Sequence, residues 1–580
     1  MKPLKNLFSL FKNDYQLLAI FSVPALIVGT FGLSQLDILS WGTFLPLTFV
    51  KFACEFLFLG ILLSLVNLIG LKNKYVLALF AFLYFIAITA DGVLLWYFKE
   101  RFGKKYVDTL QGGDYDFMTN WRLLCYFTAL ALFCFFTIKK YLKSTPRKTA
   151  LHRLIVCLAG TFLLYAFNPL WLLPAPLDFY SVYLMPPSIV YTARAMVAGG
   201  QKATITADLT GKTARLAQQY NVFTAQQTPV GKDYKRVILI ASESLSNKYM
   251  HHFNKHIPPA ASAPLDYLYE NYPSASLRHV SLSTLYGLSV IFTSHPFVKL
   301  AYENQYPISM VKELKKHGFH TSFLRGANET YMDEHILFKQ AGFDEVIGAT
   351  YFAAQESYKP FINWWGLLDR KLFDYAVDYL QSHKNQPVFM TILTLDSHVP
   401  LGRPDYAGEV YEEIDNRFYQ MPTMPRAFAR FGQDVARFLE RLDKAGLFDE
   451  DTLIAITPDH PSYSNTPTNA LFDPFEPQFD NLPFIMVTKT PITAPITDNA
   501  LASQLDIAPT LLDLLNVDIP RGMFGHSLFD LDAPRSVFDI KEDYAVVTTE
   551  NSKQIIPLNS RNAQDKEILG LMQTFIVPEK

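Results

Sequence analysis

VILIASE at residues 237–243 and LIAITPDH at residues 453–460 are two apolar runs that each end in residues of metal-binding type. Each run has the length and the β-branched content of a buried strand. In an open α/β sheet, the carboxyl ends of the parallel strands share one edge, and ligands bind there. We therefore expect Glu243, Asp459 and His460 to meet at that edge, although they lie far apart in the chain.

Further apolar segments alternate with helical periods on both sides of these runs. Such alternation predicts a mostly parallel sheet with helices on both faces. Strands are expected at 237–242, 320–325, 387–395, 452–457, 483–488 and 544–549, and helices at 308–317, 369–383, 425–445 and 503–516. In the last of these helices, Asp506 is expected to cap or brace an apolar face rather than to take part in chemistry.

The start of the chain is strongly apolar and is predicted to cross a membrane. A transmembrane helix needs about 20 apolar residues. Five runs are long enough: 16–36, 50–71, 74–98, 121–138 and 152–173. Lys and Arg are most concentrated between the fourth and fifth runs, which predicts that this loop is cytoplasmic. An odd number of spans then places the rest of the chain outside the cytoplasm.

These patterns divide the chain into three predicted parts. They are a transmembrane domain of five spans (1–173), a connector (174–230) and an α/β domain (231–580). All four cysteines lie in the first part, so the α/β domain has no disulfide, no cysteine nucleophile and no cysteine metal ligand. The formal net charge of −2 gives no sign of a nucleic-acid partner.

Glu243, Asp459 and His460 are the candidate metal ligands. A lone Glu or an Asp-His pair after a strand is more often an ordinary loop feature, so the metal-site interpretation depends on all three occurring together at one sheet edge. Oxygen and imidazole ligands in combination suit Zn²⁺ or Mn²⁺ better than Ca²⁺ or Mg²⁺. We therefore expect one divalent ion, either Mn or Zn.

A segment rich in Ser and Thr, HVSLSTLYGLSVIFTSHP at 279–296, lies between the two strands in the sequence. It becomes apolar after Ser283 and Thr284, so either hydroxyl is a candidate helix N-cap. The alternative is a nucleophile, because a hydroxyl at a helix N-terminus beside a metal is well placed to attack a phosphate. A conventional serine hydrolase is disfavoured, since 287–291 does not fit the G-x-S-x-G motif.

The chain resembles the sulfatase-like branch of the alkaline phosphatase superfamily in the order of its motifs. These are the five apolar runs, ESL at 243–245, the Ser/Thr-rich segment, SH at 397–398, DH at 459–460 and SQLDIAPTLLDLL at 503–515. It is most similar to the membrane phosphotransferases of that branch, the lipoteichoic acid synthases and phosphoethanolamine transferases. The resemblance implies a five-helix transmembrane domain followed by an α/β sulfatase-like domain with a mostly parallel sheet. It also implies a location in the bacterial cell (inner) membrane, with the catalytic domain extracytoplasmic or periplasmic.

The resemblance implies roles for individual residues as well. The three candidate ligands would bind the metal. Thr284 would be the nucleophile and would also touch the metal, with Ser283 as the fallback. His398 matches a histidine near the substrate phosphate or the leaving group, and Arg325 would assist it. Three further residues would contact the substrate: Asn328, Glu334 and Ser397.

The segment 323–345 departs from the pattern of members that polymerise glycerol phosphate. Those members carry a histidine where this chain has Arg325, and a Phe-Trp-Asn-Arg string where it has 331–334. Phosphoethanolamine transferases tend to have Arg and Asn here, which Arg325 and Asn328 match, and Glu334 would pair with an ethanolamine ammonium. Such transferases are usually rich in disulfides outside the membrane, however. The donor headgroup therefore stays open.

The expected function is transfer of a phospholipid headgroup, either phosphoethanolamine or glycerol phosphate. The group would pass through a phospho-threonine intermediate to a glycan or lipid acceptor. Two alternatives stay open: a hydrolase of the sulfatase or phosphodiesterase type, and a catalytically degenerate regulator that binds lipid. A sulfatase with a cysteine-derived formylglycine is excluded by the lack of cysteine after residue 157.

Overall fold

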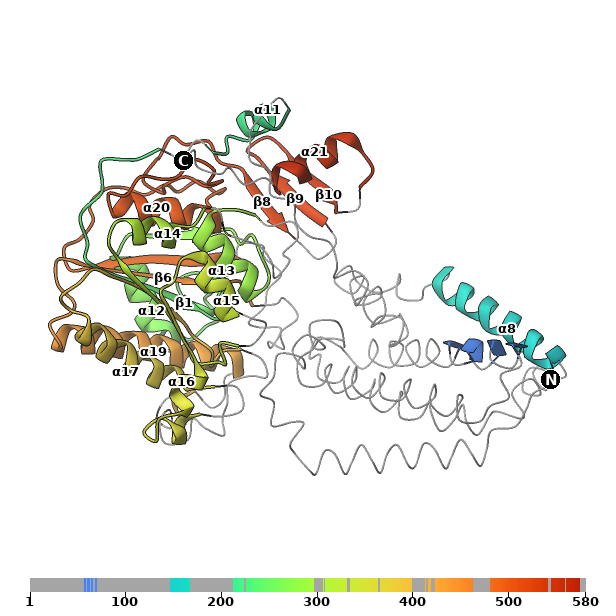
Figure 1. The fold of residues 1–580 in the computed structure, drawn as a ribbon, viewed down its shortest axis with the longest axis horizontal. Coiled ribbons are helices and arrows are strands. Elements are labelled where there is room, and N and C mark those ends of the chain that lie inside the picture. The colour runs from blue at the N-terminus through green and yellow to red at the C-terminus, as the bar shows by residue number, and fades with distance from the viewer. Residues whose placement is uncertain are drawn as a thin grey trace. The chain divides into compact units, whose positions relative to one another are not determined.

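Figure 1 shows the fold of the 580-residue chain as a computed structural model. The chain divides into two compact units, Met1–Gly200 and Gln201–Lys580, and each is described by itself. The structure describes the following residues: 57–69 in part, 147–166, 212–223, 226–296, 306, 308–330, 334–362, 366–398, 411–418 in part, 423–462, 480–540, 544–558 and 560–573.

The described part of the first unit is helical. Helix α8 (Arg147–Ala166) overlaps the fifth predicted span, and short helical pieces between 57 and 69 fall within the second. Among the residues that the structure describes, no helix is both long enough and apolar enough to cross a bilayer. The first, third and fourth predicted spans lie outside the described residues, as does most of the connector, so the five-span arrangement stays a prediction.

The second unit is built around a seven-stranded sheet with the strand order β2-β7-β6-β1-β5-β3-β4. Strand β7 runs antiparallel to both of its neighbours, whereas the other neighbouring pairs are parallel. The prediction of a mostly parallel sheet is therefore confirmed. The strands are β1 (Arg236–Ser242), β2 (Ser274–Leu277), β3 (His320–Arg325), β4 (Glu345–Ile347), β5 (Val388–Leu393), β6 (Thr452–Pro458) and β7 (Leu482–Thr488).

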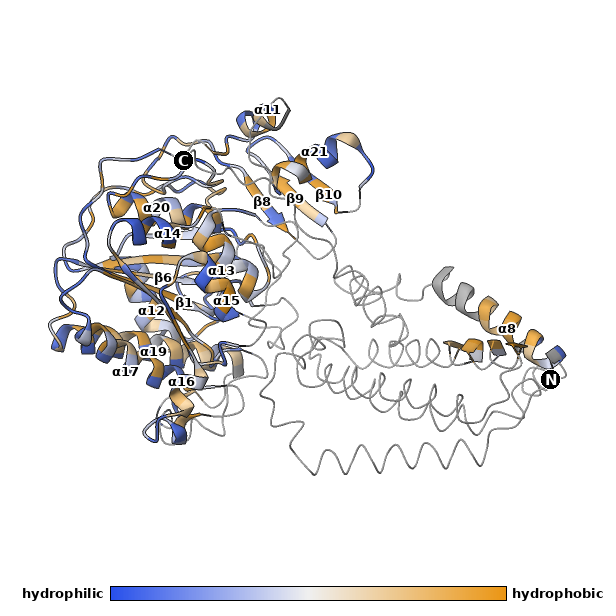
Figure 2. Ribbon diagram, in the orientation of Figure 1, coloured by the Kyte–Doolittle hydropathy of each residue, from blue (hydrophilic) through white to orange (hydrophobic). Residues whose placement is uncertain are grey.

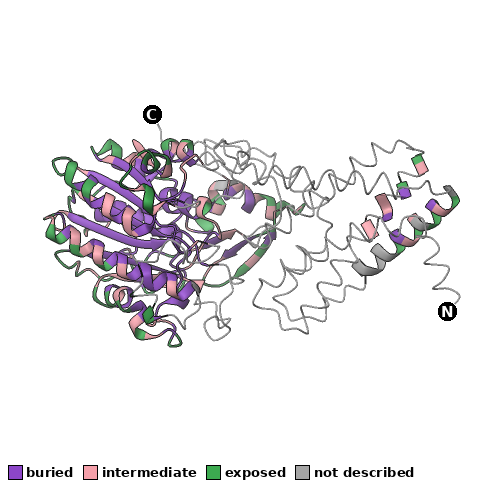
Figure 3. Cartoon of the chain, turned by 90° about the horizontal axis from the view of Figure 1, so that it is seen from below, coloured by how far each residue is buried: buried purple, intermediate pink, exposed green. Residues whose placement is uncertain are grey.

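Helices cover both faces of this sheet, and its strands are buried between them (Figures 1 and 3). Side chains of β1 alternate between the two cores: Val237 and Leu239 pack on one side, Ile238 and Ile240 on the other. This period of two follows from the pleat of a strand, and Figure 2 shows the apolar character of these strands. One core includes α13 (Thr284–Thr293), α14 (Met310–Lys316), α15 (Glu334–Ala341) and α20 (Ile507–Leu514); the other includes α12 (Pro259–Asn271), α16 (Ala349–Ala353), α17 (Asp369–Ser382) and α19 (Thr423–Lys444).

The six predicted strands and four predicted helices are all present, with ends that differ by at most two residues for the strands. The last predicted helix begins with a 3-10 turn, Gln504–Asp506, before α20. Strands β2 and β4 were not predicted, because SASL is short and half polar and EVI has only three residues, so neither forms an apolar run. The sequence pattern likewise did not indicate that β7 would run antiparallel.

A smaller antiparallel sheet, in the order β10-β9-β8, lies in the same unit. It packs with α11 (Lys212–Gln219) and α21 (Ala563–Leu571) around a core of its own. Aromatic contacts join the two ends of the unit, with the Phe223 and Phe524 ring centroids 4.8 Å apart. Residues 212–223 fall within the predicted connector yet contribute to this core. The strands are β8 (Val537–Ile540), β9 (Tyr544–Thr548) and β10 (Lys553–Pro557).

The buried carboxylate of Asp506 ties the start of α20 to a later loop. One oxygen accepts the Ser503 N–H at 2.8 Å, within a capping box, and the other accepts the His526 N–H at 2.7 Å. This confirms that Asp506 caps and braces the helix. Asp506→Ala should lower the free energy of unfolding by roughly 2–6 kcal/mol, because each unpaired buried amide costs about 1–3 kcal/mol.

Chemical denaturation of the purified protein measures this loss. The control is Asp532→Ala, at an exposed position, which should change the free energy of unfolding by no more than about 0.5 kcal/mol. Equal losses in the two variants would contradict the bracing role of Asp506.

Candidate metal centre

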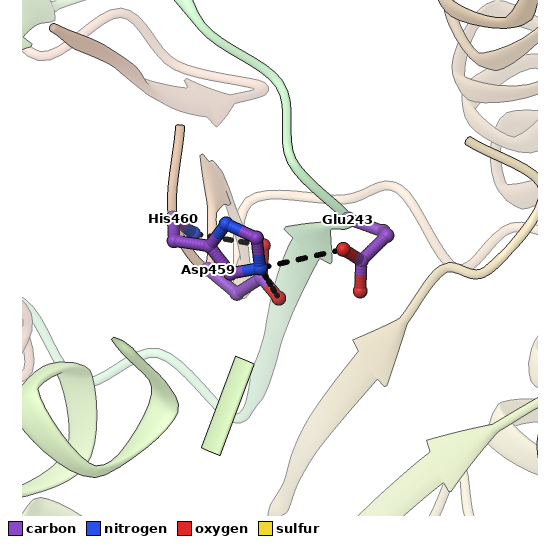
Figure 4. Close-up of side chains that lie close together, drawn as sticks. All are labelled: Glu243, Asp459 and His460. Carbon is purple, nitrogen blue, oxygen red and sulfur yellow. Dashed lines mark hydrogen bonds and ion pairs between the residues drawn. The ribbon is translucent and has the colours of Figure 1, made fainter. Parts of the chain in front are cut away.

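Three buried side chains converge at the carboxyl ends of β1 and β6 (Figure 4). Ser242 and Pro458 are partners in the register of these parallel strands, so the residues that follow them emerge side by side. One ligand atom from each of Glu243, Asp459 and His460 lies within 4.8 Å of the others. The His460 Nε2 atom is 3.4 Å from Glu243 Oε1 and 3.5 Å from Asp459 Oδ2. The structure thus confirms that the three residues meet at one edge of the sheet, as the sequence predicted.

Backbone amides orient the Asp459 carboxylate. Its Oδ1 atom accepts the N–H groups of Ser244 at 2.9 Å and of His460 at 2.8 Å. Its Oδ2 atom is buried and makes no hydrogen bond within the described part of the chain. A buried carboxylate oxygen without a hydrogen bond is costly, so this atom is suited to a cation.

The His460 ring is also oriented so that it could bind a metal. Its Nδ1 atom lies 2.8 Å from the Pro461 carbonyl oxygen. A neutral imidazole that donates its Nδ1–H to a carbonyl keeps a lone pair on Nε2, which is the usual arrangement of a metal-binding histidine. The Nε2 atom is the one that faces Glu243 and Asp459.

Thr284 completes the cluster from the other side. It is the first residue of α13, and Ser283 before it is the N-cap residue, with an extended backbone. The Ser283 hydroxyl caps no amide among the described residues, so the N-cap expectation holds for the position but not for the side chain. The Thr284 hydroxyl lies 3.3 Å from Glu243 Oε2 and 3.4 Å from His460 Nε2. The Thr284 hydroxyl therefore lies beside two of the three candidate ligands.

A glycine allows α13 to approach so closely. A Cβ atom at Gly287 would lie only 1.9 Å from the Asp459 carbonyl oxygen. The helix backbone therefore lies directly against the turn that carries two of the candidate ligands, and Thr284 is one helical turn earlier. Any side chain at position 287 would separate the hydroxyl from the ligands.

The loop after β5 holds the main chain of Glu243. The Glu243 N–H donates to the Thr394 hydroxyl at 3.0 Å, and the Ser397 hydroxyl donates to the Glu243 carbonyl at 2.6 Å. The Asp369 carboxylate in turn accepts the N–H groups of Leu395 and Asp396 at 2.7 and 2.8 Å. The structure thus gives Ser397 a contact with the main chain of Glu243, and its expected contact with the substrate stays a prediction. The sequence did not predict that Thr394 and Asp369 would support Glu243, since neither lies in a recognisable motif.

His398 ends this loop and acts on Glu243 through its charge. Its N–H donates to the Leu395 carbonyl at 2.9 Å, which closes a turn. His398 is partly buried, and its positive charge helps to lower the pKa of Glu243. His398 directly follows Ser397, whose hydroxyl bonds to Glu243, and its expected place near the substrate phosphate or the leaving group stays a prediction.

Three further predicted site residues lie at the same edge of the sheet but have partners of their own: Arg325, Glu334 and Asn328. Arg325 ends β3, two strands away from β1, which is about 10 Å. It forms a buried ion pair with Glu334, the first residue of α15. The Asn328 side-chain oxygen accepts the N–H and the hydroxyl of Thr330, each at 2.8 Å. A role for these three residues in binding substrate stays a prediction.

Burial and the crowding of charge together shift the pKa values of all three candidate ligands. Burial raises the pKa of Glu243, but the charges of His398 and His460 and the hydrogen bonds to it lower the value to about 2. Burial and the charge of Glu243 raise the pKa of Asp459 to about 7. Burial lowers the pKa of His460, but the two carboxylates raise it to about 9. A divalent cation bound here would displace the protons of Asp459 and His460.

Comparison with known proteins identifies the domain that carries this cluster. Residues 235–517 match the Sulfatase family model. We refer to these matching residues as the sulfatase-family domain. The match includes all four clustered residues and β1 to β7, and it confirms the resemblance to the sulfatase-like branch. The small antiparallel sheet and α21 lie beyond its end.

The sulfatase-family domain also has curated relatives. A phosphoglycerol transferase I from Xanthomonas campestris pv. campestris is 28% identical over 229 residues, 38% of this chain and 31% of that protein. A lipoteichoic acid synthase from Staphylococcus saprophyticus is 26% identical over 211 residues, 35% of this chain and 32% of that protein. The aligned part thus spans about a third of the length of these relatives.

Two solved structures align with the chain at low identity. A protein in the alkaline phosphatase superfamily from Vibrio parahaemolyticus has a TM-score of 0.47 and 17% identity, with 62% of this chain and 93% of that chain covered. A lipoteichoic acid synthase from Listeria monocytogenes has a TM-score of 0.44 and 14% identity, with 62% and 95% covered.

Substitution of Gly287 tests the close approach of α13. Gly287→Ala should push the helix away from Asp459, weaken binding of Mn²⁺ or Zn²⁺ and destabilise the fold by about 1–3 kcal/mol through overpacking. Isothermal titration calorimetry and thermal unfolding measure the two effects. Gly570→Ala is the matched control, because it lies in helix α21 with no described atom within 4 Å of a new Cβ. The control should be neutral or slightly stabilising.

Metal affinity should rise steeply with pH. Below pH 7 both Asp459 and His460 hold protons that the cation must displace, and His460 holds its proton up to about pH 9. Affinity should therefore increase between pH 6 and pH 9, by up to about tenfold per pH unit for each proton displaced. Calorimetry in buffers of different ionisation enthalpy counts the protons released. Binding that is independent of pH over this range would contradict the assignment of these two ligands.

Proposed function

We propose that this protein is a metal-dependent phosphotransferase, anchored in the bacterial cell membrane, that moves a phospholipid headgroup to a glycan or lipid acceptor on the extracytoplasmic side. The observation that carries the proposal is the Thr284 hydroxyl at the N-terminus of α13, within 3.4 Å of two of the three candidate ligands. The sulfatase-family domain and relatives named phosphoglycerol transferase and lipoteichoic acid synthase support it. Membrane anchoring rests on the predicted spans.

The donor set fits one divalent ion, Mn²⁺ or Zn²⁺. Two carboxylates, an imidazole nitrogen and a hydroxyl converge, and the buried Asp459 Oδ2 atom makes no hydrogen bond within the described residues. When bound, the ion would lower the pKa of the Thr284 hydroxyl and neutralise charge on the phosphate. Cysteine is absent from the sulfatase-family domain, so the nucleophile is a hydroxyl encoded by the chain.

Thr284 carries the first half of the reaction. Its Oγ1 atom forms a bond to the phosphorus of the lipid phosphodiester while the bond from phosphorus to diacylglycerol breaks. The Thr284 proton passes to water, and His398 gives a proton to the departing diacylglycerol oxygen. The free N–H groups at the start of α13 and the helix dipole favour the phosphoryl oxygens.

The second half reverses these roles. The acceptor hydroxyl attacks the phosphorus of the phospho-threonine, and the bond from phosphorus to Thr284 Oγ1 breaks. His398 takes the proton of the acceptor hydroxyl, and Thr284 regains a proton from water. The sum of the two halves is a headgroup moved from lipid to acceptor, with diacylglycerol released.

We propose glycerol phosphate as the transferred group, with phosphatidylglycerol as the donor. The curated relatives above support this choice over phosphoethanolamine. The charge of Glu334, expected to meet an ethanolamine ammonium, is matched by Arg325 in a buried ion pair. The match of Arg325 and Asn328 to phosphoethanolamine transferases is the argument for the other headgroup, so both donors are tested.

Mass spectrometry of the purified full-length chain tests the proposal. With Mn²⁺ and vesicles of phosphatidylglycerol, diacylglycerol should be released and Thr284 should gain a glycerol-phosphate adduct. Thr284→Ala should abolish the adduct and lower diacylglycerol release by at least about 10³-fold. Thr293→Ala is the matched control, because Thr293 lies at the other end of α13, with its hydroxyl bonded to the Ser289 carbonyl.

The other outcomes separate the alternatives. An adduct formed only with phosphatidylethanolamine would reassign the donor. Diacylglycerol release without dependence on an acceptor would indicate a hydrolase. Absence of both metal binding and turnover would contradict the proposed function. The lipid-binding regulator would then be the remaining alternative.

A further inference from the structure

Gln504 lies in the SQLDIAPT string at 503–510, for which the sequence predicted an apolar helix face braced by Asp506. Its side chain is fully buried, and both ends of its amide are bonded. The Nε2 group donates to the Asp459 carbonyl at 2.5 Å, and the Oε1 atom accepts the Val280 N–H at 3.3 Å. Only this orientation of the amide satisfies both partners, because one is an acceptor and the other a donor.

The two ends of this amide reach the two halves of the candidate metal centre. Asp459 belongs to the turn that carries two of the candidate ligands, whereas Val280 lies four residues before Thr284. The backbone adds a second link, because the Gln504 N–H donates to the Arg278 carbonyl at 2.9 Å. Gln504 therefore spans the gap between the nucleophile segment and the ligand turn.

The Asp459 carbonyl is held from two sides. It accepts the Gln504 amide, and it lies against the α13 backbone at Gly287, where an added Cβ would be 1.9 Å from it and 3.4 Å from Gln504 Nε2. A shift of this carbonyl would rotate the Asp459 main chain and turn the Oδ2 atom away from the other donors. Sites of this kind tolerate displacements of only about 0.5 Å.

Glutamine meets this requirement through both its length and its chemistry. A methionine has a similar length but neither donates nor accepts strongly, so it would leave a buried carbonyl and a buried N–H without partners. Such unpaired groups cost about 1–3 kcal/mol each. An asparagine keeps the amide but is one methylene shorter, so it cannot span both partners.

We infer that Gln504 is a positioning residue that sets the distance between the Thr284 hydroxyl and the metal-binding turn. The inference rests on the proposed function, since it concerns the same metal and the same nucleophile. Gln504 itself touches neither, and it acts through the Asp459 main chain. Its loss should therefore weaken metal binding even where the fold survives.

Thr510 provides a matched control for a role in stability alone. It is also fully buried and lies six residues further along the same segment. Its hydroxyl donates to the Asp506 carbonyl at 2.6 Å and accepts the Leu528 N–H at 2.9 Å. Thr510→Val therefore removes the same kind of double hydrogen bond, but neither partner belongs to the candidate metal centre.

Calorimetric titration of the full-length chain with Mn²⁺ or Zn²⁺ alone, together with thermal unfolding, tests the inference. Both Gln504→Met and Thr510→Val should lower the melting temperature. Gln504→Met should weaken metal binding about tenfold, the lower end of the range for groups that orient ligands, whereas Thr510→Val should stay within about twofold of wild type. Gln504→Asn carries the test if the methionine variant does not fold, and should also weaken binding.

The outcomes separate this inference from the proposed function. Metal affinity that stays within twofold in the Gln504 variants, or falls equally in Thr510→Val, would overturn the positioning role while leaving the function intact. A wild-type chain that binds neither ion would remove the proposed function itself. Slower formation of the Thr284 adduct in Gln504→Met at saturating metal would support the link to the nucleophile.

Discussion

One carboxylate oxygen, Asp459 Oδ1, links the ends of the two central strands β1 and β6. It accepts the N–H groups of Ser244 and His460, one from each of the turns that leave these strands. Ser244 adopts a left-handed backbone, with φ of 60°, to make its bond. Such a conformation costs of order 1–3 kcal/mol in a residue other than glycine, and it also brings the Ser244 hydroxyl 2.6 Å from Glu243 Oε1. The strained turn therefore orients both carboxylates at once.

The rest of the domain holds this arrangement rigid. The candidate ligands directly follow strands that are buried on both faces, rather than lying on long surface loops. Sites built on regular elements are held more precisely than sites on loops. Two like charges and an imidazole are kept in a space where each side chain is at most 3% exposed. Such crowding of charge away from water would oppose folding in isolation, and the two large cores of the domain offset it.

The location of the ligands could be predicted from the sequence because it depends on topology alone. Glu243 and Asp459 each follow a run of strand residues, and neighbouring parallel strands end at one edge. The side-chain contacts could not be predicted in the same way. Which group meets Ser397, Gln504 or Glu334 depends on how loops fold across the edge, and no periodic pattern records it. Short strands such as β4, β8 and β10 were missed for a related reason: their stability comes from packing rather than from an apolar run.

The core shared by α11 and α21 has a consequence for the order of folding. Asn221, near the start of the second unit, hydrogen bonds to His526, which is 305 residues later in the chain. Contacts of such high sequence separation close late, because the entropy of a long loop must be lost before they form. The large sheet is complete once β7 has formed, but the segment before β1 stays uncovered until the last strands and α21 have emerged. During synthesis, the last strands and α21 therefore complete the core around α11 only after the large sheet has formed.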